Sequence, residues 1–173
     1  MTDFLATILT ARCRIAPLED ADAAALAAIT DGSVTQRISF LPEPFTPADA
    51  RALIGRRGMG DRFHGIWSRE TGRLLGVIGV HHARRRGEIE IGYWMAATAR
   101  GQGLAREALQ ALTARLSLRH PECRMVAECH PDNGPSWELL HRVGFTHTGQ
   151  VGQRPGRVLF ARGARHQGRI DVC

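Results

Sequence analysis

The clearest alternation of apolar and polar positions lies in residues 88–94. A period of two predicts a β-strand with two distinct faces. One face takes Ile89, Ile91 and Tyr93, and the other takes Glu88, Glu90 and Trp94. After a turn at 96–99, apolar positions recur at spacings of three and four from Ala105 to Leu116, which predicts an amphipathic helix.

The same patterns predict elements on both sides of this strand and helix. Before them we expect a strand at 11–17, a helix at 18–29 ended by Asp31-Gly32, a helix capped by Thr46, and a hairpin of 63–68 and 74–81. After them we expect a strand at 124–129, a helix at 136–143, and strands at 146–151 and 158–162. Successive strands without helices predict antiparallel pairing, whereas strand–helix–strand predicts a parallel pair.

The length of 173 residues and the apolar fraction of 43% predict one domain, 1–173, with 163–173 as a fraying tail. No apolar run approaches the roughly 20 residues of a membrane span, so no membrane association is expected. The N-terminus carries Asp3 and lacks a basic region, which argues against a signal peptide and favours the cytoplasm.

The basic residues are all arginine, 23 of them, and the net charge is +6. Arginine binds phosphate and carboxylate groups bidentately, which suits an anionic cofactor or substrate. The positive charge is scattered along the chain, which disfavours nucleic-acid binding as the main function. The four cysteines show no metal-binding spacing, so we expect no metal and interpret them as buried thiols.

A glycine-containing loop joins the central strand to its helix: Arg100, Gly101, Gln102, Gly103, Leu104, Ala105. Glycine admits unusual backbone angles and lets a ligand approach bare amides. The free amides and partial positive charge of a helix N-terminus favour phosphate. The loop therefore predicts a phosphate site, with an ordinary turn before a helix as the alternative.

This segment resembles the acyl-CoA-binding motif Q/R-x-x-G-x-G/A of the GNAT N-acetyltransferases, and EIGYW before it is similar to the RimJ/RimL-type branch. The resemblance implies an α/β (α+β) fold with a central mixed, mostly antiparallel sheet of six to seven strands and about four helices. It also implies acetyl-CoA as co-substrate, with its phosphates on the amides of 101–105. The pantetheine arm would lie near Trp94 and Met95, where the fourth and fifth strands splay apart.

A second motif, in residues 132–136 with Gly144-Phe145, resembles the family segment D-N-x-x-S…G-F. The resemblance implies that Asn133 contacts the pantetheine arm. It also implies that Ser136 lies near the thioester sulfur, where it can donate a proton to the leaving thiolate. The alternative is that both residues only cap the following helix.

The catalytic acid and base are less clear from the sequence. Many family members have a tyrosine acid at the position of Leu140, but the only tyrosine here is Tyr93. The remaining possibilities for the acid are Ser136, a water, or departure of the thiolate without an acid. Glu90, on the central strand and in the family string E-I-G-Y, is the candidate base, with a structural glutamate beneath the sheet as the alternative. Some members place a glutamate base after the second motif, but residues 150–156 here contain no acid.

Two further features could lie on the acceptor side. The Pro-rich residues 41–47 would shape that side by resemblance, with an ordered surface loop as the alternative. His81 and His82 could face a cleft, but the neighbouring arginines favour a surface pair.

We therefore expect acetyl transfer from acetyl-CoA to a primary amine, either a protein N-terminal α-amine or a small molecule, by direct attack in a ternary complex. The alternatives are a non-catalytic CoA-binding module and an RNA- or ribosome-associated protein. The sequence decides neither the acceptor nor between a monomer and a homodimer.

Overall fold

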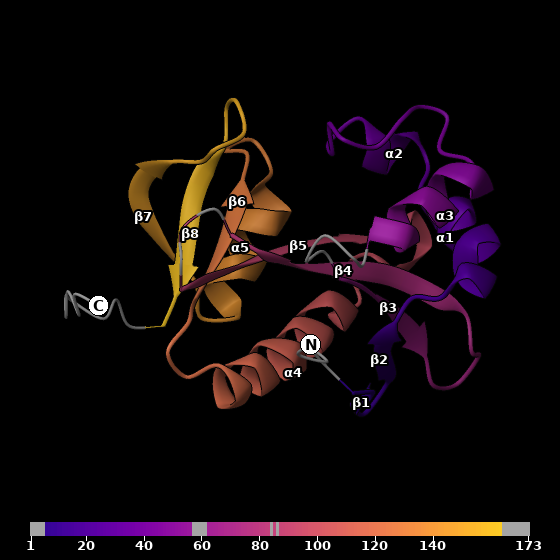
Figure 1. Cartoon of the computed structure of the whole chain (residues 1–173), viewed down its shortest axis with the longest axis horizontal. Coiled ribbons are helices and arrows are strands. Elements are labelled where there is room, and N and C mark those ends of the chain that lie inside the picture. The colour runs from indigo at the N-terminus through magenta and orange to yellow at the C-terminus, as the bar shows by residue number, and fades with distance from the viewer. Residues whose placement is uncertain (1–5, 57–61, 84, 86, 164–173) are drawn as a thin grey trace, which may run out of the picture.

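The computed structural model describes residues 6–56, 62–83, 85 and 87–163. Within them, eight strands form one sheet in the order β1-β2-β3-β4-β5-β6-β8-β7 (Figure 1). The strands are β1 (Ile8–Leu9), β2 (Cys13–Pro17), β3 (Arg62–Ser68), β4 (Leu74–His82), β5 (Glu88–Met95), β6 (Arg124–Cys129), β7 (Thr146–Val151) and β8 (Val158–Arg162). The helices are η1 (Asp20–Asp22), α1 (Ala23–Ile29), α2 (Gly32–Thr35), α3 (Pro47–Gly55), η3 (Ala97–Ala99), α4 (Leu104–Arg119) and α5 (Gly134–Arg142).

All neighbouring strands pair antiparallel except β5 and β6, which confirms the expected mixed, mostly antiparallel sheet. The tail expected at 163–173 lies outside the described residues apart from Gly163. None of the helices in the described ranges is long and apolar enough to cross a membrane.

The first strand differs from the expectation. A turn closed by the Thr10 amide and the Cys13 carbonyl separates β1 from β2, so the predicted strand at 11–17 begins at Cys13 and a further strand precedes it. Thr10 and the Arg12 amide turn aside because both donate to Glu107 on α4. The sheet consequently has more strands than the six to seven expected.

The described residues also contain an unexpected α-helix. Asp31 was expected to end the first helix, but its carboxylate accepts a hydrogen bond from the Ser33 amide and begins α2. Aspartate in this extended conformation is a favoured N-cap residue. Asp31 thus lies between α1 and α2, and α2 brings the number of α-helices in the described residues to five, where about four were expected.

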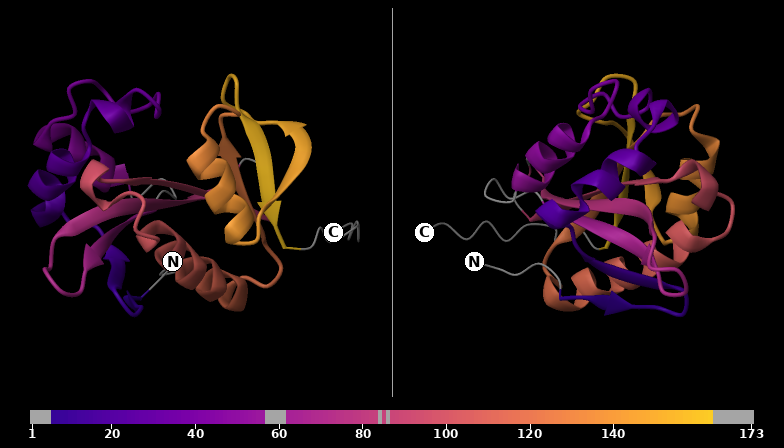
Figure 2. Two further views of the ribbon diagram at one scale, coloured as in Figure 1. Left: turned by 180° about the vertical axis from the view of Figure 1, so that it is seen from behind. Right: turned by 90° about the vertical axis from the view of Figure 1, so that its right-hand side faces the viewer.

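The sheet is covered on both faces, and each face has its own core. On one face, Ile89 and Ile91 of β5 pack with Leu109 and Leu112 of α4 in a core that α5 also joins. On the other face, Trp94 lies in a core built from β3, β4, α1 and α3. Figure 2 shows α4 on the side of the sheet away from α1 and α3. The predicted alternation along β5 is confirmed.

Strands β5 and β6 separate after a short parallel contact. They pair only from Glu88 opposite Arg124 to Glu90 opposite Val126, whereas β5 continues along β4 as far as Met95. In Figure 1, β6, β8 and β7 turn away from the rest of the sheet. The expected splay is therefore present, and it leaves the end of β5 without a neighbour on this side.

Candidate functional site

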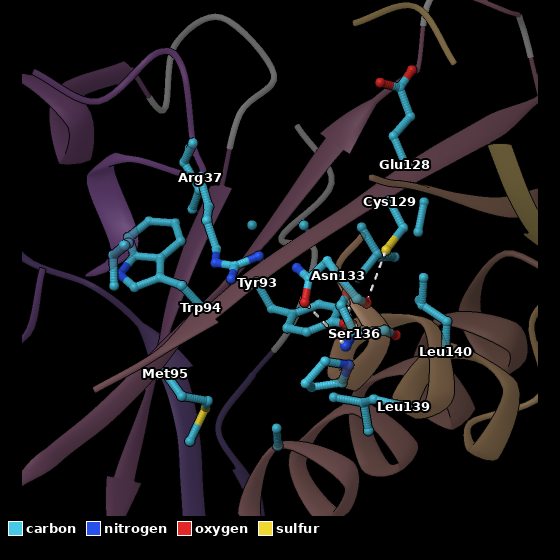
Figure 3. Close-up of a pocket in the computed structure, with 18 of the residues that line it drawn as sticks. Arg37, Tyr93, Trp94, Met95, Glu128, Cys129, Asn133, Ser136, Leu139 and Leu140 are labelled. Atoms are coloured by element: carbon cyan, nitrogen blue, oxygen red, sulfur yellow. Dashed lines mark hydrogen bonds between the residues drawn. The ribbon is translucent and has the colours of Figure 1, made fainter. Parts of the chain in front are cut away.

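A cavity of about 730 Å³ lies at the splay between β5 and β6 (Figure 3). The predicted site residues that line it are Glu90, Trp94, Met95, Arg100, Gly101, Gly103, Leu104, Ala105, Asn133 and Ser136. Gln102 does not line it, because its side-chain amide donates to the Thr98 carbonyl at 2.9 Å. The two sequence motifs, at 100–105 and 132–136, therefore meet at one cavity.

The loop before α4 has the backbone that its glycines predict. Gly101 and Gly103 both have φ of +74°, in the left-handed region that favours glycine. No side chain caps α4, and its first intrahelical bond runs from the Glu107 amide to the Gly103 carbonyl. The amides of the first turn are consequently available to an anion, beside a cavity large enough to admit one.

The N-terminal turn holds the start of α4 in place. The Arg12 guanidinium contacts the Glu107 carboxylate at 2.7 Å and donates to the Gln102 carbonyl at 2.9 Å. Partial burial opposes ionisation, but hydrogen bonds from Thr10 and Arg12 outweigh it and lower the pKa of Glu107. The glycine loop is thereby braced from outside the cavity.

Arg100 braces the loop from the other side. Its guanidinium donates to the Met95 carbonyl at 3.2 and 3.1 Å and to the Ser33 hydroxyl at 2.8 Å. The carbonyl at the end of β5 is thus already occupied. Because the Ala96 amide bonds to Leu75 of β4, alternation along the strand turns the backbone of Tyr93 towards the splay and that of Trp94 towards β4. Any contact of Trp94 with a ligand in the cavity therefore falls to its indole.

Ser136 meets the only tyrosine of the chain. The Ser136 hydroxyl lies 2.7 Å from the Tyr93 hydroxyl, and the Ser136 carbonyl lies 3.3 Å from it. Burial raises the pKa of the Tyr93 phenol well above its ordinary value, so the phenol stays protonated and can donate. No sequence pattern predicts this pair, because the two residues lie 43 positions apart on different elements.

The Cys129 thiol lies beside this pair. Its sulfur is 3.4 Å from the His130 carbonyl and 3.8 Å from the Asn133 carbonyl. Burial raises its pKa, so the group is a thiol at neutral pH. Cys13 is buried as well, Cys123 is only partly buried, and Cys173 lies outside the described residues. Three potential metal donors, His120, Glu122 and Cys123, lie within 4.8 Å of one another in the α4–β6 turn, and none of them lines the cavity.

Glu90 lines the cavity but is ion-paired. Its carboxylate lies 2.5 Å from the guanidinium of Arg154, which also contacts Glu128 at 3.1 Å. Burial opposes the charge of Arg154, but the two carboxylates outweigh it and raise the arginine pKa. Arg154 comes from the β7–β8 connection, in the stretch where the sequence offered no acid, and sequence reasoning missed it.

The favoured interpretation of His81 and His82 as a surface pair is wrong for His81. His82 is exposed, but His81 is half-buried and lines the cavity. Its ring packs edge-on against Phe63 with centroids 5.1 Å apart. The reason is the strand alternation, which turns consecutive side chains to opposite faces and places His81 opposite Glu90.

Asn133 caps α5, and we expect it also to hold the ligand of the cavity. Its side chain accepts from the Ser136 amide at 3.4 Å, a long contact. Asn133→Ala should therefore cost about 1 kcal/mol or less of stability, while the thermal stabilisation by coenzyme A is lost. Differential scanning calorimetry with and without coenzyme A measures both effects.

Thr46→Ala is the matched control, because Thr46 caps α3 away from the cavity. It should lower the Tm of the free protein and leave the coenzyme A shift intact. A large loss of stability in Asn133→Ala with an unchanged shift would contradict the ligand role.

Comparison with known proteins gives a consistent family. The model of the acetyltransferase (GNAT) domain matches residues 12–146. An uncharacterized N-acetyltransferase, p20 of Bacillus licheniformis, is 31% identical over 156 residues, which covers 83% of this chain and 84% of the relative. The ribosomal-protein-serine acetyltransferase of Escherichia coli (strain K12) is 35% identical over 81 residues, 46% of this chain and 45% of the relative. The structure of RimL, a ribosomal L7/L12 alpha-N-protein acetyltransferase, in complex with coenzyme A matches with a TM-score of 0.77 at 19% identity, over 91% of this chain and 97% of that chain.

Proposed function

Because the chain belongs to the acetyltransferase (GNAT) family and is an acyl-CoA-dependent N-acetyltransferase, we propose that it transfers the acetyl group of acetyl-CoA directly to a primary α-amine in a ternary complex. The observation that carries this proposal is the meeting of the glycine loop and the Tyr93–Ser136 pair at one cavity. The ribosomal-protein-serine acetyltransferase among the relatives supports a protein N-terminus as acceptor.

The glycine loop is the proposed site of the phosphates of acetyl-CoA. The residues fit such a group, because Gly101 and Gly103 hold left-handed backbone and the first-turn amides of α4 have no intrahelical acceptor. The pantetheine arm would extend from there along the unpaired side of β5, past Tyr93 and Asn133. The thioester supplies the electrophilic acyl group, and the chain positions it.

Ser136 is the proposed acid. The Tyr93 phenol is a hydrogen-bond donor at neutral pH and can donate to the Ser136 hydroxyl oxygen. The serine hydroxyl can then donate its own hydrogen bond into the cavity. When the amine displaces the thiolate, the serine hydroxyl stabilises or protonates the departing sulfur. The Tyr93 phenol in turn orients that hydroxyl from the opposite element. The missing family tyrosine would thus be replaced by a serine with a tyrosine behind it.

Glu90 is the proposed base, and it acts from the other face of the sheet. Strand alternation puts Glu90 with Trp94 on the α1/α3 side and Tyr93 on the α4 side, yet all three line the cavity. One carboxylate oxygen of Glu90 binds Arg154, and the other can accept the amine proton directly or through water. The amine and the thioester would then meet through the splay. Positioning of this kind can contribute about 7–11 kcal/mol.

The test of the proposed function is acetylation of a panel of peptides with free N-termini, the same peptides with blocked N-termini and a free lysine, and small primary amines. Product mass and free thiol release report transfer. We expect turnover of free N-terminal peptides without a burst of free thiol when the amine is omitted. A burst without amine would indicate an acyl-enzyme and contradict direct transfer.

Ser136→Ala should lower kcat by about 10²–10³-fold, because one donor to a developing charge is typically worth that much. The Kd for acetyl-CoA should change little, since the contact strengthens only as the sulfur leaves. Tyr93→Phe keeps the serine but frees its orientation, so a smaller loss of kcat is expected. Single-turnover rates and calorimetric affinities measure the two effects. Full activity of both variants would exclude this acid.

A further inference from the structure

The short helix α2 and the residues after it line the cavity, among them Ser33, Val34 and Arg37. At its start, the Ser33 hydroxyl accepts from Arg100, beside the glycine loop. Past its end, the Arg37 carbonyl accepts from Arg157 at 2.6 Å, and Arg157 belongs to the β7–β8 connection. The two ends of this segment therefore mark two ends of the cavity, one at the proposed phosphate site and one on the side of the proposed acceptor.

At the acceptor end the carboxylates already have partners. Arg154 contacts both Glu90 and Glu128. Glu128 also accepts from the backbone amides of Gln153 at 2.5 Å and of Arg154 at 3.1 Å, so it is saturated and structural. Glu128 is therefore committed within the protein, and one carboxylate oxygen of Glu90 is left for the reacting amine.

Two guanidinium groups at the same end have no carboxylate partner among the described residues. Arg157 donates only to main-chain carbonyls, of Glu128 at 3.4 Å and of Arg37 at 2.6 Å. The exposed Arg37 side chain makes no hydrogen bond or ion pair with the described part of the chain, and Figure 3 shows it extending from its segment into the cavity on the side of Trp94 and Tyr93. Glu90, Glu128 and Arg154 together carry one negative charge. The two positive charges of Arg37 and Arg157 exceed it, so this end of the cavity is positive.

We propose that the acceptor is an amine that carries a carboxylate close to the reacting nitrogen, and that Arg37 binds this carboxylate. This inference rests on the proposed function and specifies its substrate class: a peptide N-terminus followed by an acidic residue. A planar guanidinium matches a carboxylate bidentately, and Arg37 is the one of the two whose side chain makes no hydrogen bond or ion pair with the described residues. The same positive end repels polyamines and other polycations.

The wild-type enzyme tests the class. We compare kcat/KM for three peptides that differ only in the second residue: Ser-Glu, Ser-Gln and Ser-Lys. We expect kcat/KM for Ser-Glu to be about tenfold higher than for Ser-Gln, and to exceed that for Ser-Lys by a larger factor. Both ratios should decrease as salt is added. Equal rates, or a preference for Ser-Lys, would overturn the inference and leave the proposed transfer intact. Acetylation of none of these amines would overturn both.

Arg37→Gln tests the residue. The ratio of kcat/KM for Ser-Glu over Ser-Gln should fall about tenfold, a modest effect because the side chain is exposed. Arg51→Gln, an exposed arginine on α3 that does not line the cavity, should leave the ratio unchanged. A weaker Kd for acetyl-CoA in Arg37→Gln with an unchanged ratio would assign Arg37 to a phosphate of the cofactor instead and overturn the proposal.

Discussion

Replacing Gly103 by valine is expected to raise the Kd for acetyl-CoA by at least about 100-fold. A β-branched residue disfavours the φ of +74° that Gly103 holds at the first turn of α4. If the loop shifts, the amides of Leu104 and Ala105 no longer converge. Loss of two hydrogen bonds to a charged phosphate, at about 1.5–3 kcal/mol each, gives this factor. Isothermal titration calorimetry with acetyl-CoA measures it.

Backbone strain alone would also lower stability, so a matched glycine is needed. Gly72 has φ of +69° in the β3–β4 turn, and a Cβ added there meets nothing within 4 Å. At Gly103 an added Cβ meets only Arg12, at an ordinary 3.6 Å. Gly72→Val and Gly103→Val should therefore each lose about 1–3 kcal/mol of stability, and only the second should lose the cofactor. Unchanged affinity in Gly103→Val would remove the phosphates from this loop.

Glu90→Gln is expected to reduce the rate at neutral pH by about 10²–10⁴-fold, the usual contribution of a general base. The amide keeps the shape of the side chain and can still accept from Arg154, so the fold should persist. It cannot take up the amine proton. If Glu90 is the base, the acidic limb of the wild-type rate profile should vanish in the variant. Single-turnover rates from acidic to alkaline pH measure both effects.

The acceptor amine also titrates, so two amines of different pKa are compared. If the acidic limb of the pH–rate profile shifts with the pKa of the amine, it reports the substrate. If it stays at the same pH, it reports a group of the enzyme. Glu88→Gln is the control, because Glu88 lies on the same strand, is similarly buried, and pairs with Arg124 at 3.3 Å, but does not line the cavity at the β5–β6 splay. It should lose stability and keep its pH profile. A full rate and an unchanged profile in Glu90→Gln would leave the glutamate a structural role.

The fold was largely predictable because its signals are local. The period of two in β5 and the spacing of α4 follow from which side chains face each core, and the structure confirms both. The misplaced start of β2 and the missed α2 depend on single polar contacts. The Thr10 hydroxyl donates to Glu107 of α4, which interrupts the first strand. Asp31 begins α2, although an aspartate at this position could equally mark the end of the preceding helix. Patterns of hydrophobicity carry neither event.

The site was predictable only where one segment holds it. The glycine loop and the Asn133–Ser136 segment each present their chemistry within a few residues, and both line the cavity. The partners of the two candidate catalytic side chains lie far away in the sequence: Tyr93 reaches Ser136 from another element, and Arg154 reaches Glu90 across 64 positions. Such contacts depend on the register between strands, which a single sequence does not specify.

With acetyl-CoA in the proposed site, the arginines around the cavity would also protect the enzyme from its own chemistry. Every basic residue that lines it, apart from His81, is an arginine, and the whole chain contains no lysine. A lysine beside a bound thioester offers an ε-amine that can compete with the substrate and be acetylated, whereas a guanidinium stays protonated and is a poor nucleophile. Positive charge can thus be concentrated next to the acetyl donor without self-modification, and the chain itself contributes no lysine amine to an acetylation assay.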